Sequence, residues 1–268
     1  MKSLGETVKK MFPDLKPMPY AEMKQKQIKQ FNDSEGDLNE GDGYDCRVCK
    51  NKGFIAYLSG EGEEVWRACK CKKVRSTLRR AKRSGLGDVL RDYTFDKFVV
   101  MDEWQKELKE KAQAFCKDDN AKWFYIGGQV GCGKTHLCTA IAAHYIKAGK
   151  ELRYMLWAEE SKFLKANVNE SVYQEKMDEY KNVDVLYIDD FLKVKSGATP
   201  TDADINLAFE IINHRLITAD KITILSSEKE LSELLDYDEA TMSRIYQRTG
   251  PYKFSIAKDK GKNYRLKG

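Results

Sequence analysis

The sequence predicts an α/β fold, in which a parallel sheet lies between two layers of helices and follows a small cysteine-bearing unit. Three observations lead to this expectation. Short apolar runs alternate with helical patterns from about residue 92 to the end, as in strands joined by crossover helices. A glycine-rich turn joins an apolar run to a helix-forming run at 122–148. Two close pairs of cysteines occur earlier, in a region without that alternation.

Composition counts against several classes of protein. The 268 residues are 41% hydrophobic and 11% aromatic, which is enough for a sizeable core and argues against global disorder. No apolar run approaches the roughly 18 residues that a membrane span needs, and the N-terminus lacks the apolar core of a secretory signal. We therefore expect a cytoplasmic protein without a membrane partner, whose seven cysteines stay reduced.

Composition also divides the chain into four segments. Residues 1–43 contain two helical patterns and a polar loop at 32–43, and residues 44–72 carry the cysteine pairs. Residues 73–91 form a basic helix and linker, and residues 92–268 form the α/β part. In that part the expected strands are 122–127, 152–157, 183–188, 222–226 and 252–256, and the expected helices are 102–118, 134–148, 158–166, 171–181, 202–218, 228–235 and 238–248.

The glycine-rich turn matches the pattern of a phosphate-binding loop, in the strand–loop–helix context that this pattern requires. Glycines let successive backbone N–H groups point into one concavity, and the following helix adds the positive end of its dipole. Lys134 is expected to reach the β- and γ-phosphates of ATP, and the Thr135 hydroxyl to bind Mg²⁺. The alternative is an ordinary glycine turn before a lysine. The expected loop consists of Gly128, Gln129, Val130, Gly131, Cys132, Gly133, Lys134 and Thr135.

An apolar strand at 183–188 ends in two carboxylates, Asp189 and Asp190. A parallel strand beside a phosphate loop delivers its C-terminal residues to the metal and the γ-phosphate. We expect Asp189 to hold Mg²⁺ through water and Asp190 to orient or deprotonate the attacking water. The alternative is that one or both carboxylates cap the following turn.

The cysteines form two close pairs, Cys46 with Cys49 and Cys69 with Cys71. Two such pairs, separated by an insert of hairpin size, are what a tetrahedral thiolate site for Zn²⁺ requires. The second pair has one intervening residue instead of two, which weakens the match. We expect a structural zinc ion, and the alternative is a reduced, metal-free core.

Positive charge is concentrated between Lys70 and Arg83, where eight Lys or Arg residues occur without an acid. Such a block suggests nucleic acid or another polyanion as a partner, and the alternative is a solvated helix face. Arg244 and Arg248 lie four residues apart on a helix that Asp238 is expected to begin. A guanidinium there suits a γ-phosphate supplied by a neighbouring protomer. The alternative is surface pairing with nearby acids.

With these motifs the chain resembles the AAA+ helicase loaders of the bacterial DnaC/DnaI type, in the IstB-like ATP-binding superfamily, and a phage or prophage member in particular. The loop at 127–137, with His136 and Leu137 after Lys-Thr, is similar to that of the family. Residues 93–98 resemble the segment that packs near the nucleotide base. The cysteine unit resembles the zinc domain that contacts the helicase in DnaI-type loaders. The resemblance covers residues 44–268 and implies an AAA+ P-loop NTPase with a three-layer αβα sheet.

The resemblance also assigns roles around the γ-phosphate. The strand at 222–227 stands where the family has its first sensor, and Ser226 or Ser227 replaces the Asn that is frequent there. Arg244 looks like the arginine finger and Arg265 like the second sensor, although Arg265 also belongs to a basic terminus that solvation alone would explain. Asp190 stands where many AAA+ ATPases have Glu, and its shorter reach implies slow hydrolysis.

The function implied is ATP-dependent loading of the replicative hexameric helicase onto single-stranded DNA, with self-association through the ATP site. DNA contacts are expected along 158–181, where Lys162, Lys165 and Tyr173 would meet phosphates and a base, or would merely solvate a helix. Two alternatives share the core: a transposition helper ATPase of the IstB type, not expected to carry the cysteine unit, and a non-hydrolysing ATP-binding adaptor. A DnaA-like initiator would need a further DNA-reading domain after the last strand.

Overall fold

The computed structural model describes residues 18–83, 86–87, 89–195, 198–218 and 220–266. The chain divides into two compact units, with the boundary between Lys72 and Lys73. The first of the two helical patterns expected in 1–43 lies outside the described residues. The four-segment division stays an interpretation of the sequence.

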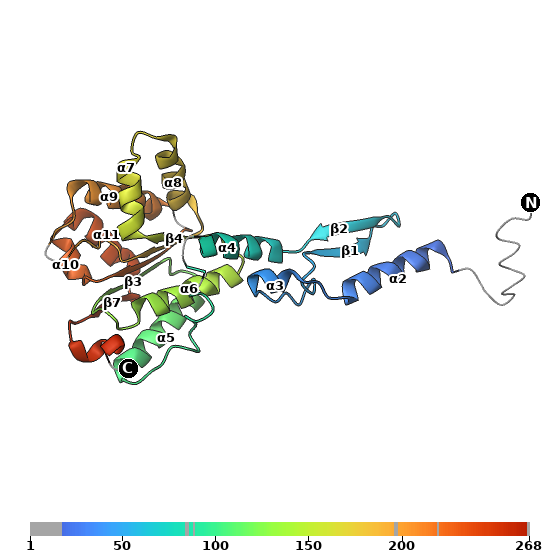
Figure 1. The fold of residues 1–268 in the computed structure, drawn as a ribbon, viewed down its shortest axis with the longest axis horizontal. Helices are drawn as coiled ribbons and strands as arrows, with labels where there is room; N and C mark the ends of the chain where they lie inside the picture. The colour runs from blue at the N-terminus through green and yellow to red at the C-terminus, as the bar shows by residue number, and fades with distance from the viewer. Residues whose placement is uncertain (1–17, 84–85, 88, 196–197, 219, 267–268) are drawn as a thin grey trace, which may run out of the picture. The chain divides into compact units, whose positions relative to one another are not determined.

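The larger unit is built on one parallel sheet of five strands (Figure 1). Its spatial order is β4-β5-β6-β3-β7, so the strand that leads into the phosphate loop lies between two others. Every predicted strand is confirmed, with ends that differ by at most two residues. The strands are β3 (Trp123–Gly128), β4 (Leu152–Leu156), β5 (Val185–Asp189), β6 (Ile222–Ser227) and β7 (Lys253–Ile256).

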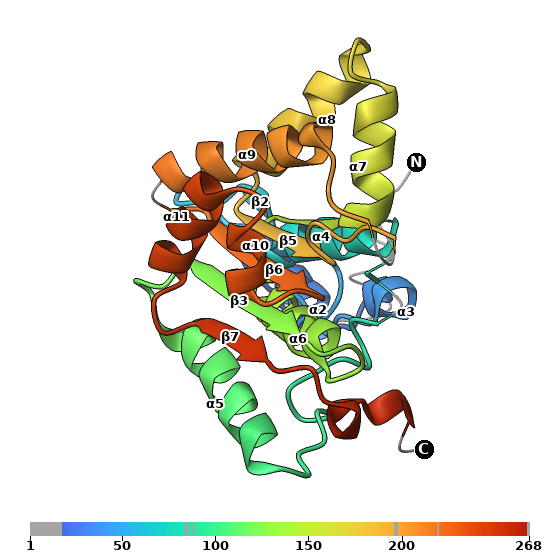
Figure 2. The same cartoon turned by 90° about the vertical axis from the view of Figure 1, so that its left-hand side faces the viewer.

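Helices cover both faces of this sheet, and the predicted three-layer αβα class is confirmed (Figure 2). The helices α5 and α6 lie on one face, and α9, α10 and α11 lie on the other (Figure 2). Two short 3₁₀ turns, η1 (Lys260–Lys262) and η2 (Tyr264–Leu266), follow the last strand. The helices are α5 (Glu103–Lys117), α6 (Lys134–Lys147), α7 (Trp157–Ala166), α8 (Ser171–Asn182), α9 (Asp202–Ile217), α10 (Leu231–Leu235) and α11 (Glu239–Thr249).

The three central strands of this sheet are buried along their whole length. Every residue of β3, β5 and β6 is buried, as expected where helices cover both faces of a parallel sheet. The edge strand β4 is only partly buried. Trp157 and Phe191 are fully buried beside one another, with ring centroids 5.2 Å apart. The carboxyl ends of β3, β5 and β6 are therefore fixed relative to one another.

Arg215 forms hydrogen bonds at the end of the sheet opposite to these carboxyl ends. Its guanidinium is fully buried and donates to the Thr223 hydroxyl at 2.9 Å and to the Ile222 carbonyl at 2.6 Å. It also donates to the carbonyls of Tyr180 and Val183 at 2.9 and 3.0 Å. One side chain thus joins the end of α8 to the start of β6.

The smaller unit surrounds an antiparallel hairpin of β1 (Phe54–Leu58) and β2 (Glu64–Ala68). The helix α2 (Tyr20–Asp33) confirms the second helical pattern expected before residue 43. Near its end, the Asn32 side chain accepts a hydrogen bond from the Ala56 backbone N–H at 3.1 Å and donates to the Ala56 carbonyl at 2.8 Å. The amide thereby pairs with β1 as a strand neighbour would.

The polar segment expected as a loop at 32–43 contains a short helix, α3 (Leu38–Asp42), and that expectation was wrong. The Gly36 N–H donates to the Lys50 carbonyl at 2.7 Å, and the Leu38 N–H to the Asn51 carbonyl at 3.3 Å. Gly43, with φ of 69°, ends the helix. Tertiary hydrogen bonds, which composition does not reveal, hold this turn.

The basic run forms the helix α4 (Cys71–Arg83), as predicted. Val74, Arg75, Thr77 and Ala81 are buried along one face of it, whereas Lys72, Lys73, Arg79 and Lys82 are exposed. One face of the helix is therefore structural and only the other is open to solvent. Within the described part of the chain, no helix has the length and apolar character that spanning a membrane requires.

Candidate nucleotide site and cysteine centre

The phosphate loop connects β3 to α6 and depends on three glycines in the left-handed region. Gly128, Gly131 and Gly133 have φ of 104°, 73° and 95°. A Cβ on Gly131 would lie 1.9 Å from Oδ1 of Asn263, so a side chain here would have to displace Asn263 and would also strain the backbone. Because these glycines have no Cβ atom, the loop backbone can approach a bound group more closely than other residues would allow.

Lys134 and Thr135 open α6, where the helix N-terminus favours negative charge. The buried Lys134 ammonium donates to the carbonyls of Gly128 and Gln129 at 2.8 and 2.6 Å, so it lies inside the loop. The thiol of Cys132 is also buried and donates to the Gln129 carbonyl at 2.9 Å, while Val130 is exposed. Cys132 therefore supports the loop from within.

Asp189 ends β5 at the centre of a polar cluster. The Thr135 hydroxyl lies 3.4 Å from its Oδ1, and the Tyr154 hydroxyl donates to its Oδ2 at 3.1 Å. The buried Ser226 hydroxyl donates to Oδ1 as well. Burial raises the pKa of Asp189, and the hydrogen bonds oppose that shift. A carboxylate and a hydroxyl within reach of each other are a suitable ligand set for Mg²⁺ beside the loop.

The two serines of β6 have different surroundings. Ser226 contacts Asp189 and also accepts from the Asp190 N–H at 3.2 Å. Ser227 instead donates to the Phe191 carbonyl at 2.9 Å and accepts from the Lys229 N–H at 3.2 Å. Of the two first-sensor candidates, only Ser226 lies against the carboxylate expected to bind the metal.

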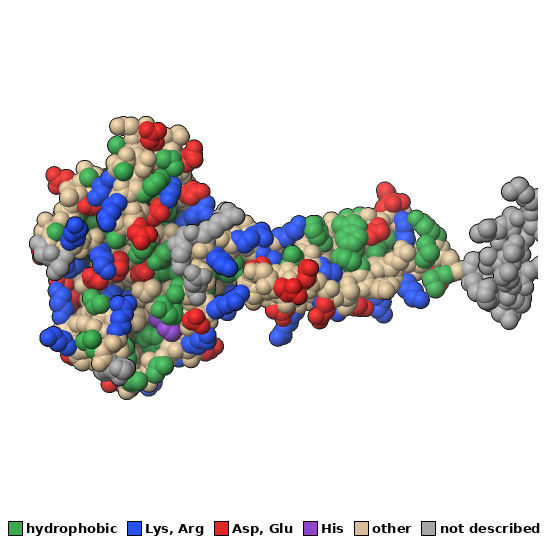
Figure 3. All heavy atoms as spheres, viewed as in Figure 1, with side chains coloured by type: hydrophobic (Ala, Val, Ile, Leu, Met, Phe, Trp, Pro, Cys, Tyr) green, Lys and Arg blue, Asp and Glu red, His purple; other side chains and the backbone are tan. Residues whose placement is uncertain are grey.

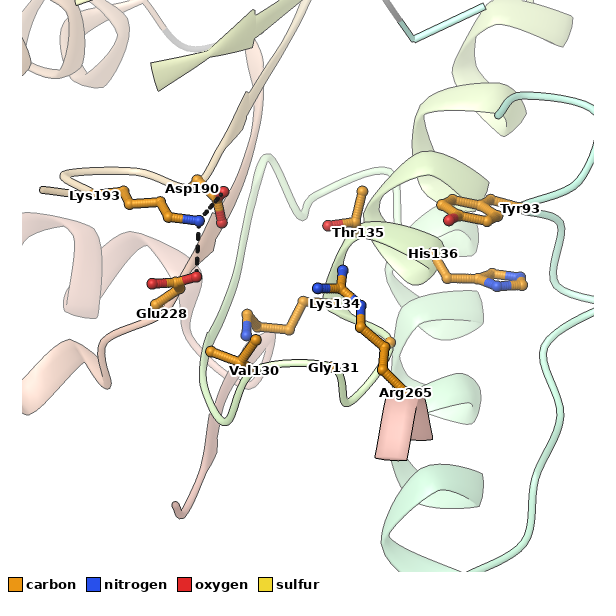
Figure 4. Close-up of a pocket in the computed structure, with 11 residues that line it drawn as sticks. Tyr93, Val130, Gly131, Lys134, Thr135, His136, Asp190, Lys193, Glu228 and Arg265 are labelled. Carbon is orange, nitrogen blue, oxygen red and sulfur yellow. Dashed lines mark hydrogen bonds and ion pairs between the residues drawn. The ribbon is translucent and has the colours of Figure 1, made fainter. Parts of the chain in front are cut away.

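Asp190 lies in a pocket of about 230 Å³ beside the loop, together with two residues that the sequence motifs did not indicate (Figure 4). These are Lys193, three residues after Asp190, and Glu228, which follows β6. The signals for them were a lysine three residues after the acidic strand end and an acid directly after the two serines of the expected first sensor. The pocket is lined by Tyr93, Val130, Gly131, Gly133, Lys134, Thr135, His136, Asp190, Lys193, Glu228 and Arg265.

An aromatic pair forms another part of the pocket wall. The rings of Tyr93 and His136 stack with centroids 4.8 Å apart and planes 9° apart. Nε2 of His136 lies 2.8 Å from the Thr94 carbonyl, which requires that nitrogen to carry the proton. Burial lowers the pKa of His136, so the ring is neutral near pH 7. A flat, uncharged stack of this kind suits a nucleotide base.

Arg265 reaches the pocket because the segment after β7 is attached to the phosphate loop. The Tyr264 N–H donates to the Gly131 carbonyl at 3.0 Å. The Asp259 N–H donates to Oε1 of Gln129 at 2.8 Å. The position of Arg265 is consistent with that of a second sensor.

The four expected zinc ligands come together in the smaller unit. The sulfur atoms of Cys46, Cys49, Cys69 and Cys71 all lie within 4.8 Å of one another and are buried. The Cys46–Cys69 and Cys49–Cys71 sulfur distances are 3.8 and 3.5 Å, far longer than a disulfide bond of about 2.05 Å. Four thiolates about 2.3 Å from one ion at tetrahedral angles have nearly this spacing. The donor set therefore fits Zn²⁺.

Backbone donors make the thiolate form accessible. The Gly53 N–H donates to the Cys49 sulfur at 3.2 Å. Burial raises the pKa of Cys49, but the hydrogen bonds from Gly53, Cys71, Cys46 and Cys69 lower it to about 7 in total. Burial dominates at Cys69, where the pKa is raised. The low-pKa thiol of Cys49 is consistent with a cluster that a metal ion would deprotonate completely.

Comparison with known proteins agrees with this nucleotide site. The family model for the bacterial DnaA ATPase domain matches residues 89–249. The phage-like element PBSX protein XkdC of Bacillus subtilis is 31% identical over 234 residues, which cover 83% of this chain and 85% of XkdC. The chain belongs to this AAA+ ATPase family.

Two solved structures share the AAA+ fold. DnaI superposes with a TM-score of 0.51 at 22% identity, over 63% of this chain and 92% of DnaI. The DnaC helicase loader superposes with a TM-score of 0.50 at 20% identity, over 63% of this chain and 98% of DnaC. The resemblance to AAA+ proteins of the DnaC/DnaI type is thereby confirmed, with the fold as the property in common.

The predicted arginine finger of this AAA+ protein lies outside its own nucleotide pocket. Arg244 is exposed on α11 and donates to Oδ1 of Asn213 at 2.7 Å. Arg248 donates to the Leu216 carbonyl at 3.1 Å. As predicted, Asp238 begins α11, and its side chain accepts from the Thr241 N–H. The position of Arg244 is open to a second molecule.

Two of the three expected DNA contacts in α7 and α8 are occupied within the AAA+ domain. The Lys165 ammonium is paired with the buried carboxylate of Asp204 at 2.5 Å. The Tyr173 hydroxyl donates to Glu210 at 3.0 Å. Lys162 is exposed. Of the three, Lys162 is the one whose surroundings leave it best placed for a phosphate.

Proposed function

We propose that the chain is an ATP-dependent loader of the replicative hexameric helicase, which it places on single-stranded DNA at replication initiation in the cytoplasm. One observation carries the proposal. A phosphate loop with Thr135 and Asp189 beside it occurs in the same chain as a four-cysteine unit with exposed apolar side chains. The first can act as a switch, and the second as the part that holds a protein partner. The DnaC helicase loader, which shares the fold, supports this direction.

At the nucleotide site, the backbone of the loop and the Lys134 ammonium would hold the phosphates. Thr135 and Asp189 would hold Mg²⁺, which supplies charge neutralisation at the phosphates. Asp190 would orient the attacking water and accept its proton, and Ser226 would hold Asp189 in place. Asp190 is one methylene shorter than Glu and lies in a turn that fixes its backbone. We therefore expect slow hydrolysis.

Self-association would complete the site. Arg244 is exposed on α11 and is not among the residues that line its own pocket. A planar guanidinium is suited to a terminal phosphate held by a neighbouring protomer. ATP would thus connect protomers, and loss of the γ-phosphate would disconnect them.

The cysteine unit has a surface suited to a protein partner. Val48, Phe54, Tyr57 and Trp66 are all exposed, with 72% of Val48 and 49% of Trp66 accessible. Figure 3 shows apolar side chains together on this unit, around its hairpin. Aromatic side chains on a small rigid unit are typical anchors of protein interfaces. The proposed occupant is the helicase.

The proposal is tested by mixing the purified chain with its cognate helicase in the presence of ATP or ADP and measuring complex mass. A complex that needs ATP and is lost in Trp66→Ala supports it. Absence of any complex with ATP would refute it.

A second candidate function, a non-hydrolysing adaptor, is kept because Asp190 is held in an ion pair. Single-turnover hydrolysis with and without single-stranded DNA separates the two. A transposition helper of the IstB type would associate with a transposase and not with the helicase.

A further inference from the structure

Lys193 is a cationic side chain of the nucleotide pocket that lies outside the phosphate-loop pattern. Its ammonium is 2.9 Å from Oδ2 of Asp190 and 2.8 Å from Oε1 of Glu228, so it bridges two carboxylates (Figure 4). All three side chains are partly buried, with accessible fractions of 36% for Lys193, 25% for Asp190 and 33% for Glu228. Ion pairs in such surroundings are less screened than those on an open surface.

The turn that carries Lys193 is held in an unusual conformation. Asp190 and Leu192 both have φ of 55°, which side chains other than glycine rarely adopt. Phe191 and Leu192 are buried, and the Lys193 N–H donates to the Asp190 carbonyl at 2.9 Å. The Phe191 N–H donates to the Ser226 carbonyl at 2.7 Å. Backbone conformations of this kind persist only where the surroundings impose them, and they are concentrated at functional sites.

The consequence of the turn is that Lys193 points back toward the residue that should activate water. Asp190 follows β5 and Glu228 follows β6, and these strands are neighbours in the sheet. The ammonium therefore lies between the carboxyl ends of two strands, on the wall of the pocket that contains Lys134 and Thr135. This is the side of the pocket from which Asp190 would meet an attacking water.

The charges of Lys193 and its two carboxylate partners affect how the pocket binds a triphosphate. Two carboxylates that face a triphosphate would repel it, whereas an ammonium between them attracts it. A lysine has three N–H donors, and Asp190 and Glu228 each accept from one. A phosphate oxygen is a strong acceptor for the same donors. The terminal phosphate of ATP can therefore compete with Asp190 for the ammonium, whereas ADP has no group at that position.

We propose that Lys193 is a γ-phosphate sensor: its ammonium binds the terminal phosphate, leaves Asp190 and thereby frees that carboxylate for the attacking water, while Glu228 keeps Lys193 in place. The inference rests on the proposed ATPase function and adds a regulatory residue to the same site. With ADP bound, Lys193 stays paired with Asp190. The exchange of partners makes Asp190 available only when there is a γ-phosphate to attack.

The test is the ratio of affinities for a non-hydrolysable ATP analogue and for ADP, each measured with Mg²⁺ by calorimetry. In Lys193→Met, affinity for the ATP analogue should fall about tenfold to a hundredfold, because one charge-assisted hydrogen bond is lost. Affinity for ADP should be unchanged, which also shows that the variant is folded. If Lys193→Met does not fold, Lys193→Gln serves the same purpose.

A double variant removes the simplest competing explanation. Lys193→Met leaves two carboxylates without their cation, and their repulsion alone would weaken ATP binding. Lys193→Met with Glu228→Gln removes one charge of each sign, so the net charge of the pocket is that of the wild type. If Lys193 is a sensor, this double variant should still lose its preference for the ATP analogue over ADP. Recovery of the wild-type ratio would show repulsion alone and overturn the proposal.

A matched lysine outside the pocket provides the control. Lys111 forms an ion pair with Glu107 at 2.8 Å and has 44% of its side chain accessible, close to the values for Lys193. Lys111→Met should leave both affinities as they are. If the wild type binds and hydrolyses ATP but Lys193→Met leaves the ratio of affinities for the ATP analogue and ADP unchanged, only the sensor role of Lys193 is overturned. A wild type that binds neither nucleotide overturns the proposed function instead.

Discussion

The Ser226 hydroxyl donates a hydrogen bond to the Asp189 carboxylate and accepts one from the Asp190 N–H at 3.2 Å. One side chain on β6 thus connects the carboxylate expected to hold Mg²⁺ with the backbone of the carboxylate expected to activate water. The relationship makes Ser226 a positioning residue for both.

Ser226→Ala should therefore slow hydrolysis without abolishing nucleotide binding. We expect kcat to fall about tenfold to a hundredfold, because a charge-assisted hydrogen bond between buried groups is lost. ADP affinity should stay close to that of the wild type. Ser227→Ala is the matched control, since its hydroxyl bonds to backbone groups of Phe191 and Lys229. Equal losses of kcat in both variants would contradict the role of Ser226.

Gly131→Ala should disrupt nucleotide binding by two separate effects. The backbone has φ of 73°, and the new methyl group would collide with Asn263. Gly149→Ala, outside the loop, is the control for a non-glycine residue at positive φ, because Gly149 has φ of 81° but a methyl group there would have no neighbour within 4 Å. Gly149→Ala should cost about 1 kcal/mol of stability and leave ATP affinity unchanged. ATP affinity is measured by calorimetry. Loss of affinity in both Gly131→Ala and Gly149→Ala would refute the role of the close contact between Gly131 and Asn263.

Arg215→Met should destabilise the ATPase unit by about 3–5 kcal/mol, because several buried carbonyls lose their donor. Arg153 is the control: it pairs with Glu179 at 2.5 Å near the surface, and Arg153→Met should cost less than about 1 kcal/mol. Urea unfolding followed by tryptophan fluorescence measures both. A similar, small change in the two variants would show that the buried network contributes little.

Zinc release from the cysteine unit should increase as the pH falls. The ion needs thiolates, so protons compete with it, and the affinity is lost as protonation of the cluster becomes favourable. Because burial raises the pKa of Cys69, protons already compete with the ion at neutral pH, and the competition grows at lower pH, where Cys49, whose pKa is about 7 without metal, is protonated as well. A colorimetric zinc assay across this range checks the expectation. One equivalent of zinc at neutral pH is expected, and none in Cys49→Ser/Cys71→Ser.

Arg244→Ala should lose hydrolysis but keep ATP binding, because its own pocket does not contain Arg244. Mixing it with Lys134→Ala provides the decisive measurement. Each Lys134→Ala protomer retains an arginine for a neighbour's site, so part of the activity should return in the mixture. Arg248→Ala is the control. No recovery in the mixture would favour the alternative, in which Arg244 only pairs on the surface.

The sequence was sufficient to predict the parts of the fold and of the site that local patterns of residues determine. Burial on both faces makes β3, β5 and β6 continuous apolar runs, and the loop at Gly128–Thr135 has a fixed pattern of residues. Cysteine spacing likewise predicted that the four sulfur atoms would meet. Each of these follows from a pattern of residues in the chain itself.

The sequence was insufficient where the outcome depends on distant contacts. The helix α3 is held by the carbonyls of Lys50 and Asn51, which no local pattern indicates. Lys193 became a pocket residue because two left-handed residues turn the chain back after Asp190. The choice between Ser226 and Ser227 required the register of β6 against β5. These features could be found only in three dimensions.

ATP binding at the phosphate loop is proposed to drive delivery of a helicase to DNA, and this step can be measured directly. Helicase hexamers retained on circular single-stranded DNA are counted after incubation with the chain and ATP. We predict retention with the wild type and loss of it with Lys134→Ala, which removes the phosphate-binding ammonium. Equal retention with both proteins, or with no chain added, would contradict the proposed function.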